Sequence, residues 1–475
     1  MADYQSPLAT RYATAAMVTN FSDRRRVLLW RDLWIALARA EQALGVPVTD
    51  AQLEALVAHR DEIDFDRVAE LEAKLRHDVM AHVHHWGEQV GPEAEKIIHL
   101  GATSCYVADN AELVMMRDGL ELLMDRLVAV IEQLAAFARE HRGLPTLAYT
   151  HFQPAQLTTV GKRACLWAQD VAFDLESVDA LRERLPFRGV KGTTGTQASF
   201  LSLFDGDHGK VRELDQRVSA AFGFAGSVPV SGQTYPRKID SWVVSTLADV
   251  CSSAAKLAVD VRLLAHKREV EEPFGRSQIG SSAMAYKRNP MRCERICSLA
   301  RFVASLATSP LQTHANQWFE RTLDDSANRR LVLTEAFLAT DAVLNLLVDV
   351  TAGLVVYPAV LRANVEQELP FMATENVIMA GVRGGQSRQE LHERIRVHSH
   401  EAARRMKEEG VPNDLLERMR ADEVLGPFVL DEVLDPIAYV GRAPQQVDEF
   451  LAEVVQPLLE RHAPRRGRFR SRVAV

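Results

Sequence analysis

Apolar residues recur three and four positions apart along most of the chain, which is the spacing of one face of an α-helix. Two long runs are regular: Leu120, Leu123, Leu127, Val130, Leu134 and Phe137, and then Val243, Leu247, Val250, Ala254, Leu257, Val261 and Leu264. A third run, from Leu331 to Val356, is apolar on more than one face. A helix that is apolar nearly all round must be buried on all sides. The pattern therefore predicts a core of long, packed helices.

The predicted helices divide the chain into three regions. Helices of about 30 residues form a bundle about 45 Å long, which we place at residues 104–356. Shorter amphipathic helices precede it, one of them ending at Gly45, and shorter, more charged helices follow Tyr357. We therefore predict an all-α fold with an N-terminal domain at 1–103, this central bundle and a C-terminal domain at 357–475. One bundle alone does not bury all of these apolar faces, so bundles from different subunits are expected to associate.

The composition is that of a globular protein and argues against several classes of function. The chain has 475 residues, of which 47% are hydrophobic and 25% charged, as is typical of globular chains of several domains. A net charge of -8 argues against nucleic acid as a partner. No apolar run is long enough to predict a membrane span, and the N-terminus lacks a signal-peptide pattern. Five scattered cysteines fit reduced thiols, so a cytoplasmic location is expected. The basic end, Arg465–Arg472, is expected to be solvated.

A short stretch of small and polar residues, Gly280–Pro290, interrupts the helical pattern. Ser281 and Ser282 offer hydroxyl and main-chain N–H groups, and Lys287 adds a mobile positive charge. Such a loop can close on an anion. A surface loop without a function would have the same composition, so the residues alone leave both interpretations open.

Two further segments hold groups that can bind anions or titrate. Arg76, His77 and Asp78 place a cation, an imidazole and a carboxylate side by side, although a solvated helix face would look the same. The four histidines of this segment lack the i,i+4 pair that a helical metal site favours, so we expect no metal. Thr103 or Ser104 can cap the helix that follows and turn its N-terminal amides toward a carboxylate. Capping without a ligand is an equally good interpretation.

Another candidate segment, Trp318–Arg330, ends a loop and opens a helix. Ser326 is at the position of an N-cap, and Arg321 and Arg330 can flank the positive end of the helix. This arrangement suits a phosphate monoester. A capped helix with surface arginines is the alternative.

His151 lies among uncharged hydrogen-bonding residues, Thr150, Gln153 and Gln156. Such neighbours can orient an imidazole so that it transfers a proton. A structural hydrogen bond is the alternative role for a lone histidine.

The stretch Gly280–Pro290 resembles the signature loop of the fumarase/aspartase superfamily, Gly-Ser-Ser-x-Met-Pro-x-Lys-x-Asn-Pro. Ala285 stands where that pattern has proline, which predicts a more flexible loop. The longer form, which continues through Tyr286–Arg292, resembles the animal-type adenylosuccinate lyase family. The resemblance extends from Ser6 almost to the last helical segments.

The resemblance implies a homotetramer with a shared helical core, and a β-elimination that needs neither a metal nor an organic cofactor. Fumarate would leave adenylosuccinate to give AMP, and the succinyl-carboxamide intermediate of purine synthesis (SAICAR) to give AICAR, so the partner is a small-molecule nucleotide. Family roles place His151 as general acid and Ser281 as general base, with Lys287 and His77 also catalytic. Serine is a weak base in water, so Lys287 and nearby amides must stabilise its alkoxide. The residues that match substrate contacts of the family are Arg11, Tyr12, Arg76, His77, Asp78, Thr103, Ser104, Gln233, Lys287, Asn289, Arg295, Arg321, Ser326 and Arg330.

Two other functions share parts of this pattern. A sister lyase, such as argininosuccinate lyase or a carboxymuconate cycloisomerase, would have the same loop and fold but no use for a phosphate clamp. A helical scaffold without catalysis would not need His151 and Ser281. These two residues and the Arg76–Asp78 cluster lie in separate segments, and long bundle helices would hold such segments apart within one chain. We therefore expect each active site to be assembled from three chains.

Overall fold

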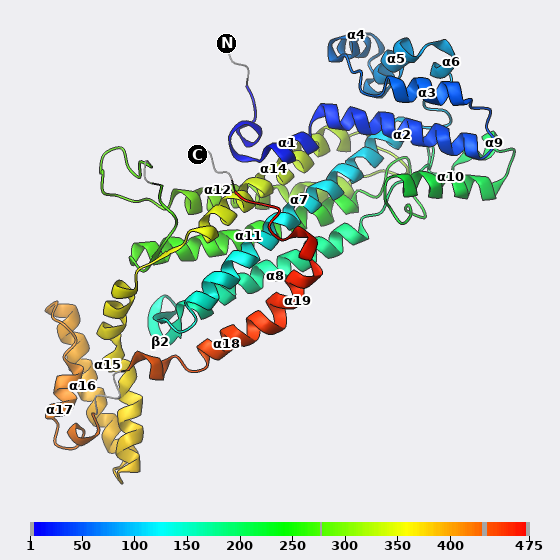
Figure 1. Cartoon of the computed structure of the whole chain (residues 1–475). Helices are drawn as coiled ribbons and strands as arrows, with labels where there is room; N and C mark the ends of the chain where they lie inside the picture. Colours follow the sequence, from blue (N-terminus) through cyan, green and yellow to red (C-terminus); the bar gives the residue numbers. More distant parts are fainter. Residues whose placement is uncertain (1–3, 276–277, 430–434, 472–475) are drawn as a thin grey trace.

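The computed structural model describes residues 4–275, 278–429 and 435–471, and most of these are helical. Long helices run side by side as a central bundle (Figure 1): α7 (Ser104–Glu140), α8 (Val160–Arg184), α11 (Lys238–His266), α12 (Met291–Leu306) and α14 (Asp325–Ala352). Every residue of α14 from Ala336 to Val348 is buried, which confirms the prediction of a long helix buried on all sides. By length and composition alone α11 and α14 are apolar enough to cross a bilayer, but 83% of the most apolar stretch of α14 is buried inside the molecule.

Shorter helices gather at one end of the bundle. The π-helical turn η1 (Leu8–Tyr12) and α1 (Ala15–Asn20) lie along α14 and α7 and lead into α2 (Asp23–Ala43), α3 (Asp50–Ala58), α4 (Phe65–Leu75), α5 (Asp78–Val90) and α6 (Pro92–Glu95). From the middle of the chain, α9 (Ala198–Leu203) and α10 (His208–Ala221) join the same end (Figure 1). Polar side chains accept a backbone N–H at several helix starts, among them Thr14, Ser22, Thr49, Asp64 and Asp207.

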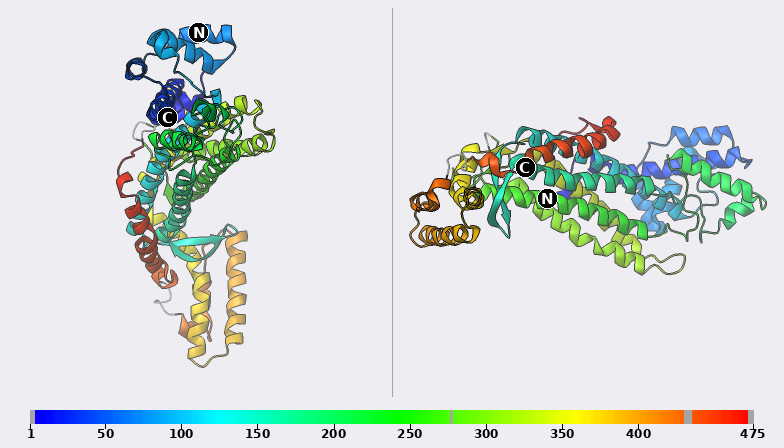
Figure 2. Two further views of the ribbon diagram at one scale, coloured as in Figure 1. Left: turned by 90° about the vertical axis from the view of Figure 1, so that its right-hand side faces the viewer. Right: turned by 90° about the horizontal axis from the view of Figure 1, so that it is seen from below.

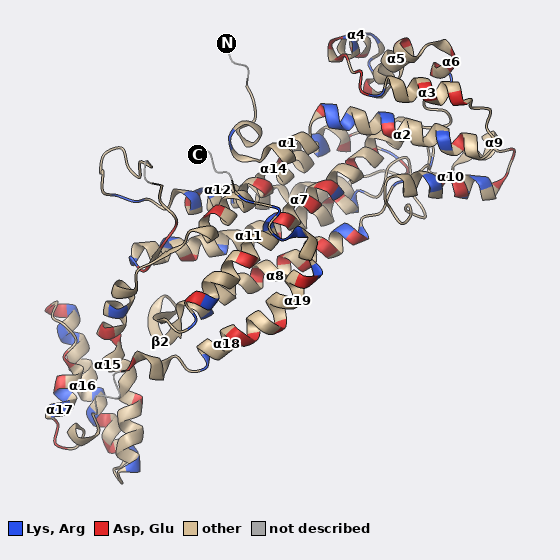
Figure 3. Cartoon of the chain, viewed as in Figure 1, with Lys and Arg blue, Asp and Glu red and all other residues tan. Residues whose placement is uncertain are grey.

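The opposite end of the bundle contains two small sheets and a helical unit. The strands β1 (Pro145–Thr150) and β2 (Gln153–Thr159) form an antiparallel hairpin, and β3 (Val270–Glu271) pairs with β4 (Val355–Val356). The hairpin packs on α15 (Pro358–Arg383), whose partners α16 (Arg388–Glu408), α17 (Leu415–Ala421) and the turn Gly426–Phe428 share a separate core. Figure 2 shows these helices extending beyond the bundle, and Figure 3 shows both basic and acidic residues along them. The sequence analysis did not predict these strands, because segments this short do not show a clear periodicity of apolar residues.

The chain returns to the bundle after the turn Pro436–Tyr439. The elements α18 (Ala443–Phe450), η5 (Leu451–Val455), α19 (Gln456–Arg461) and the turn Ala463–Arg465 run back along α8 and α7 (Figures 1 and 2). Their apolar side chains belong to the main core, among them Val447, Leu451, Val455 and Leu458. The predicted region 357–475 therefore has one part with a core of its own and another part in the core of the bundle. A further short helix, α13 (Thr308–Ala315), follows α12.

The basic C-terminal end lies on the bundle. Arg465 contacts Glu121 of α7 and lies 2.9 Å from Asp125 of the same helix. The prediction of a solvated end is wrong for Arg465, whose charge is neutralised by these acidic residues of α7. Arg466, Arg468 and Arg470 are exposed, as predicted. Arg472, which the same prediction included, lies outside the described residues.

Candidate functional site

A cavity of about 340 Å³ lies where the N-terminal helices meet the bundle. Residues of α2, α4 and α5 form one wall, and residues from the beginnings of α7 and α14 form the other. The residues predicted from the sequence that line it are Asp78, Arg321, Ser326 and Arg330. Its volume is within the range of small-molecule sites. The fold thus brings together predicted residues that are far apart in the sequence.

One ion pair connects the two walls of the cavity. The Arg330 guanidinium donates to the Asp78 carboxylate at 2.6 Å, and the backbone N–H of Val79 donates to the same carboxylate at 2.8 Å. Burial opposes ionisation, but these donors hold the pKa of Asp78 below its usual value, so the carboxylate is charged at neutral pH. The side chain of Arg330 stays 59% exposed, which leaves part of its guanidinium accessible to a ligand anion.

Arg76 and His77 lie at the junction of α4 and α5, directly before Asp78. Arg76 ends α4 with a left-handed φ of 55°. His77 caps α5, and its Nδ1 accepts the backbone N–H of Met80 at 3.3 Å. An accepting Nδ1 places the proton of the neutral ring on Nε2, which is then a donor. This junction therefore presents a hydrogen-bond donor beside the cavity.

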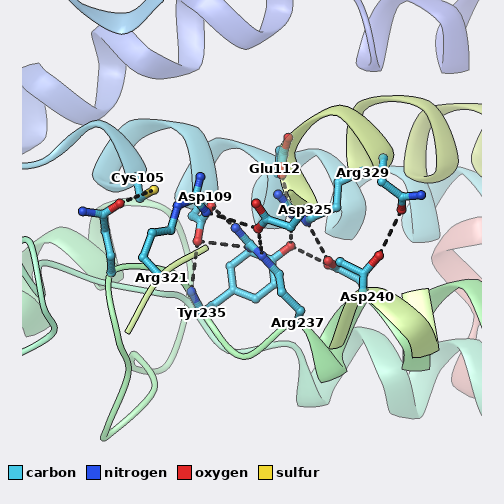
Figure 4. Close-up of polar contacts among 12 residues, drawn as sticks. Cys105, Asp109, Glu112, Tyr235, Arg237, Asp240, Arg321, Asp325 and Arg329 are labelled. Atoms are coloured by element: carbon cyan, nitrogen blue, oxygen red, sulfur yellow. Dashed lines mark hydrogen bonds and ion pairs between the residues drawn. The ribbon is translucent and has the colours of Figure 1, made fainter. Parts of the chain in front are cut away.

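A network of buried charged residues forms part of the cavity wall, and the sequence did not reveal it (Figure 4). Arg237 donates to Asp109 of α7 at 3.0 Å and to Asp325 of α14 at 2.6 Å. Arg329 of α14 donates to Asp240 of α11 at 2.7 Å. Removing one partner of such a pair costs about 3–5 kcal/mol, because the other charge is left buried and unpaired. The network therefore fixes the starts of three bundle helices relative to one another.

Tyr235 and Gln233 attach the segment before α11 to this network. The Tyr235 hydroxyl donates to Asp240 at 2.6 Å, and its backbone N–H donates to Asp109 at 2.9 Å. Gln233, a predicted substrate contact, accepts from the thiol of Cys105 at 3.6 Å, and that thiol lines the cavity. Gln233 therefore lies next to a residue of the cavity wall, and its role as a substrate contact stays a prediction.

Two helix starts differ in detail from the prediction. α14 begins at Asp325, so Ser326 lies within the first turn, and its predicted N-cap position is wrong. The helix starts earlier because Arg237 and Arg321 both bind the Asp325 carboxylate, at 2.6 and 3.2 Å. α7 begins at Ser104, and Thr103 occupies the N-cap position without a side-chain capping bond.

The signature loop lies at the other end of α11, between β3 and α12. It closes on itself: the Asn289 side-chain amide donates to the Gly280 carbonyl at 2.8 Å, and a Cβ at Gly280 would come within 2.1 Å of the Lys287 carbonyl oxygen. The Ser281 Oγ accepts the backbone N–H of Met284 at 3.1 Å. A backbone donor at this distance stabilises negative charge on an oxygen. The loop therefore has a geometry that suits a serine alkoxide.

The hairpin between α7 and α8 presents His151 at its tip. His151 and Phe152 both have positive φ, 53° and 56°, which is uncommon for residues other than glycine. Each such residue costs about 1–3 kcal/mol and persists where the surrounding structure enforces it, often at functional sites. In the described part of the chain, the His151 ring has no hydrogen bond, so its predicted orientation by Thr150, Gln153 and Gln156 is not seen within one chain.

Tyr12 lies close to Arg295 of α12. The Arg295 guanidinium carbon is 5.7 Å from the centre of the Tyr12 ring, and that of Arg11 is 5.9 Å from it. The structure thus brings three predicted substrate contacts together, one helical turn beyond the end of the signature loop.

One chain keeps the cavity and the His151 hairpin far apart. Gln233, at the cavity, precedes α11. At the other end of α11, the Tyr149 hydroxyl of the hairpin donates to Glu269 at 3.4 Å. Because α11 has 29 residues, it separates these groups by about 40 Å. A ligand the size of a nucleotide cannot contact both groups in a single chain.

Comparison with known proteins places these features in a family. Residues 10–304 match the model of a family described as lyase, and residues 370–450 match that of the adenylosuccinate lyase C-terminus. Over 464 residues the chain is 55% identical to the adenylosuccinate lyase of Saccharomyces cerevisiae, covering 96% of each chain. It is 53% identical to that of Schizosaccharomyces pombe over 461 residues, covering 96% of this chain and 95% of the other. The fold is similar to that of a fumarate lyase from Mesorhizobium sp. BNC1, with a TM-score of 0.79 at 26% identity, covering 93% of this chain and 99% of that one.

Proposed function

This chain belongs to the adenylosuccinate lyase family, and from that premise we propose that it releases fumarate from adenylosuccinate to give AMP, and from SAICAR to give AICAR. The observation that carries the proposal is the identity of 55% across 96% of both chains with a relative of that name. The cavity adds a chemical reason, because it offers Arg321, Ser326 and Arg330 to the phosphate of a nucleotide.

The phosphate is proposed to bind at the start of α14. Asp325 lies in this turn, but its carboxylate is paired with Arg237 at 2.6 Å, which limits its repulsion of an anion. Arginine side chains at a helix N-terminus attract a phosphate dianion through both charge and hydrogen bonds. Argininosuccinate has no phosphate to place against Arg321 and Arg330, which would then pair only with Asp325 and Asp78. The cavity therefore favours a nucleotide over an amino-acid substrate.

The elimination is proposed to use Ser281 as base and His151 as acid. The Ser281 alkoxide takes the proton from the carbon next to a succinyl carboxylate, and the electron pair moves onto that carboxylate. The C–N bond then breaks, and His151 gives its proton to the leaving nitrogen. Lys287 and Asn289 are proposed to donate to the charged carboxylates, where one donor is worth about 3 kcal/mol at the transition state. His77 is proposed to donate from Nε2 to the substrate.

Each active site is proposed to combine groups from three chains of a homotetramer. The outer faces of two bundle helices support this: Leu166 and Phe173 of α8 are 45% and 58% exposed, and Val259 and Leu263 of α11 are 42% and 38% exposed. Apolar patches of this kind commonly mark subunit interfaces. All five cysteines are free thiols, which supports a cytoplasmic location.

Fumarate release tests the proposed function. The purified protein is given adenylosuccinate, SAICAR or argininosuccinate, and fumarate is followed by ultraviolet absorbance, with Ser281→Ala as the inactive control. We expect fumarate from the first two compounds and a rate at least about 100-fold lower from the third, because only the nucleotides fill the phosphate site. Faster cleavage of argininosuccinate would favour the sister lyase, and no fumarate from any compound would contradict a lyase function.

A further inference from the structure

The C-terminal end of the chain and Thr14, which follows the segment with Arg11 and Tyr12, contact the same buried residue. Between them is Arg126 of α7, whose side chain is only 2% exposed. Its guanidinium lies 2.6 Å from the Asp341 carboxylate of α14 and donates to the Thr14 hydroxyl at 2.8 Å. A buried cation thus connects the two central helices to the N-terminal segment.

Thr14 is held by both members of this buried ion pair. Its hydroxyl accepts from Arg126, and its backbone N–H donates to Asp341 at 2.6 Å. The same hydroxyl starts α1 by accepting the backbone N–H of Met17 at 3.5 Å. Burial raises the pKa of Asp341, and these donors oppose that rise because they stabilise the charged carboxylate. The position of Thr14 therefore depends on where the Arg126 guanidinium lies.

Phe469 covers this guanidinium from the C-terminal side. The centre of its ring lies 4.3 Å from the Arg126 guanidinium carbon, which is a cation–π contact. On one side of Phe469 the tail is fixed by Arg465, which pairs with acidic residues of α7. On the other side the Ser471 hydroxyl donates to Asp349 of α14 at 3.3 Å. The tail is therefore anchored on both sides of the ring.

We propose that Phe469 and Arg126 are positioning residues, through which the C-terminal tail holds Thr14 and the adjacent Arg11–Tyr12 segment in their binding positions. Tyr12 is two residues before Thr14. The turn η1 that contains Tyr12 is closed by the Ala13 N–H, which donates to the Leu8 carbonyl at 2.8 Å, so a shift at Thr14 is passed to that turn.

This inference rests on the proposed function, because Tyr12 and its neighbour Arg295 are proposed substrate contacts. A positioning residue that touches no substrate changes binding while the chemical step stays intact. Loss of the Phe469 ring is therefore expected to appear in KM more than in kcat.

The test uses the full chain with Phe469→Ala, Phe469→Tyr and Arg466→Ala. Loss of the ring should raise KM for adenylosuccinate about three- to tenfold and change kcat by less than about twofold. Backbone amides of residues 4–21 should exchange hydrogen faster in Phe469→Ala, because Thr14 is less firmly held. Phe469→Tyr keeps an aromatic face and should restore both KM and protection.

Arg466→Ala is the matched control, because it removes a tail ion pair with Glu132 at 2.6 Å without touching Arg126. It should leave KM and amide protection at the wild-type values. Unchanged KM and unchanged protection in Phe469→Ala would overturn the inference. The inference would also be overturned if Arg466→Ala reproduced both effects, because the effects would then come from attachment of the whole tail and not from the Phe469 ring.

The two proposals can fail separately. If the wild-type protein releases no fumarate from adenylosuccinate or SAICAR, the proposed function fails. Amide exchange in residues 4–21 still decides whether Phe469 holds the N-terminal segment, because it needs no substrate. If fumarate is released and Phe469→Ala matches the wild type in both measurements, only the further inference fails.

Discussion

Glu41 of α2 is a carboxyl group placed in the apolar core. It is fully buried, and neither of its oxygens has a hydrogen-bond partner among the described residues. Burial without a compensating donor disfavours the charged form, and it raises the pKa of Glu41 from 4.5 to about 8. The folded protein therefore holds a proton at neutral pH that the unfolded chain releases.

The sign of the resulting pH dependence follows from this proton. Between the unfolded value of 4.5 and the folded value of about 8, the folded state binds one more proton than the unfolded state. The contribution of Glu41 to stability is thus fully present below pH 4.5 and falls by about 1.4 kcal/mol per pH unit as the pH rises. We expect Glu41→Gln to remove this fall. Between pH 5 and 8, the free energy of unfolding of the variant should therefore rise relative to that of the wild type.

Denaturant unfolding at pH 5, 6, 7 and 8 measures this difference. Glu54→Gln, at an exposed position of α3, is the matched control and should give a curve parallel to that of the wild type. Parallel curves for Glu41→Gln and the wild type would show that Glu41 does not hold a proton in the folded state.

Residue chemistry could be predicted where the reacting groups lie close together in the sequence. Ser281, Lys287 and Asn289 form one loop, and the structure places the Met284 N–H on the Ser281 hydroxyl. The buried network in the cavity wall could not be predicted in this way. Arg237 binds partners 88 and 128 positions away, and no local pattern indicates such pairs.

At the scale of elements, long helices were predictable and the hairpin was not. The run that became α14 is apolar on more than one face, and few structures other than a buried helix accommodate it. The hairpin depends on a two-residue turn, His151–Phe152, without the Asn-Gly or Asp-Gly pair that usually indicates such a turn. Here tertiary packing against α15 overrides local preference.

Ala285 lies in a turn of the signature loop that suits proline. The Lys287 N–H donates to the Met284 carbonyl at 3.0 Å, so Ala285 is the second residue of a β-turn, where proline is favoured. Ala285→Pro should lower the entropy lost when the loop closes, by about 0.4–1 kcal/mol, and raise kcat/KM about two- to fivefold. Global thermal stability should change little, because the loop is exposed.

Ala283→Pro is the contrasting variant for this loop. The Ala283 N–H donates to the Ser281 hydroxyl at 3.4 Å, and proline would remove that donor. We expect kcat to fall in this variant while the melting temperature stays near that of the wild type. Equal kcat/KM in Ala285→Pro and the wild type would show that the departure from the superfamily pattern is neutral.

At the scale of the whole molecule, we expect a single chain to be an incomplete catalyst. The rigid length of α11 keeps the cavity and the His151 hairpin about 40 Å apart. Local loop motion cannot close such a distance, whereas antiparallel association of two bundles brings opposite ends of equal helices together. The prediction of sites shared between chains therefore depends on the length of the helices, and this length could be predicted from the spacing of apolar residues in the sequence.

Mixing two inactive variants tests sharing directly. His151→Ala and Ser281→Ala each remove one proposed catalytic group, so each should be inactive alone. In randomly mixed tetramers, a site that takes His151 from one chain and Ser281 from another contains both intact groups about one time in four. We therefore expect about a quarter of wild-type activity after subunit exchange, measured as fumarate release.

Ser281→Ala mixed with Lys287→Ala is the matched control for this experiment. Both residues belong to one loop of one chain, so no mixed site can be complete. Recovery in the control, or none in the test pair after confirmed exchange, would contradict the proposal that His151 and Ser281 of one site come from different chains.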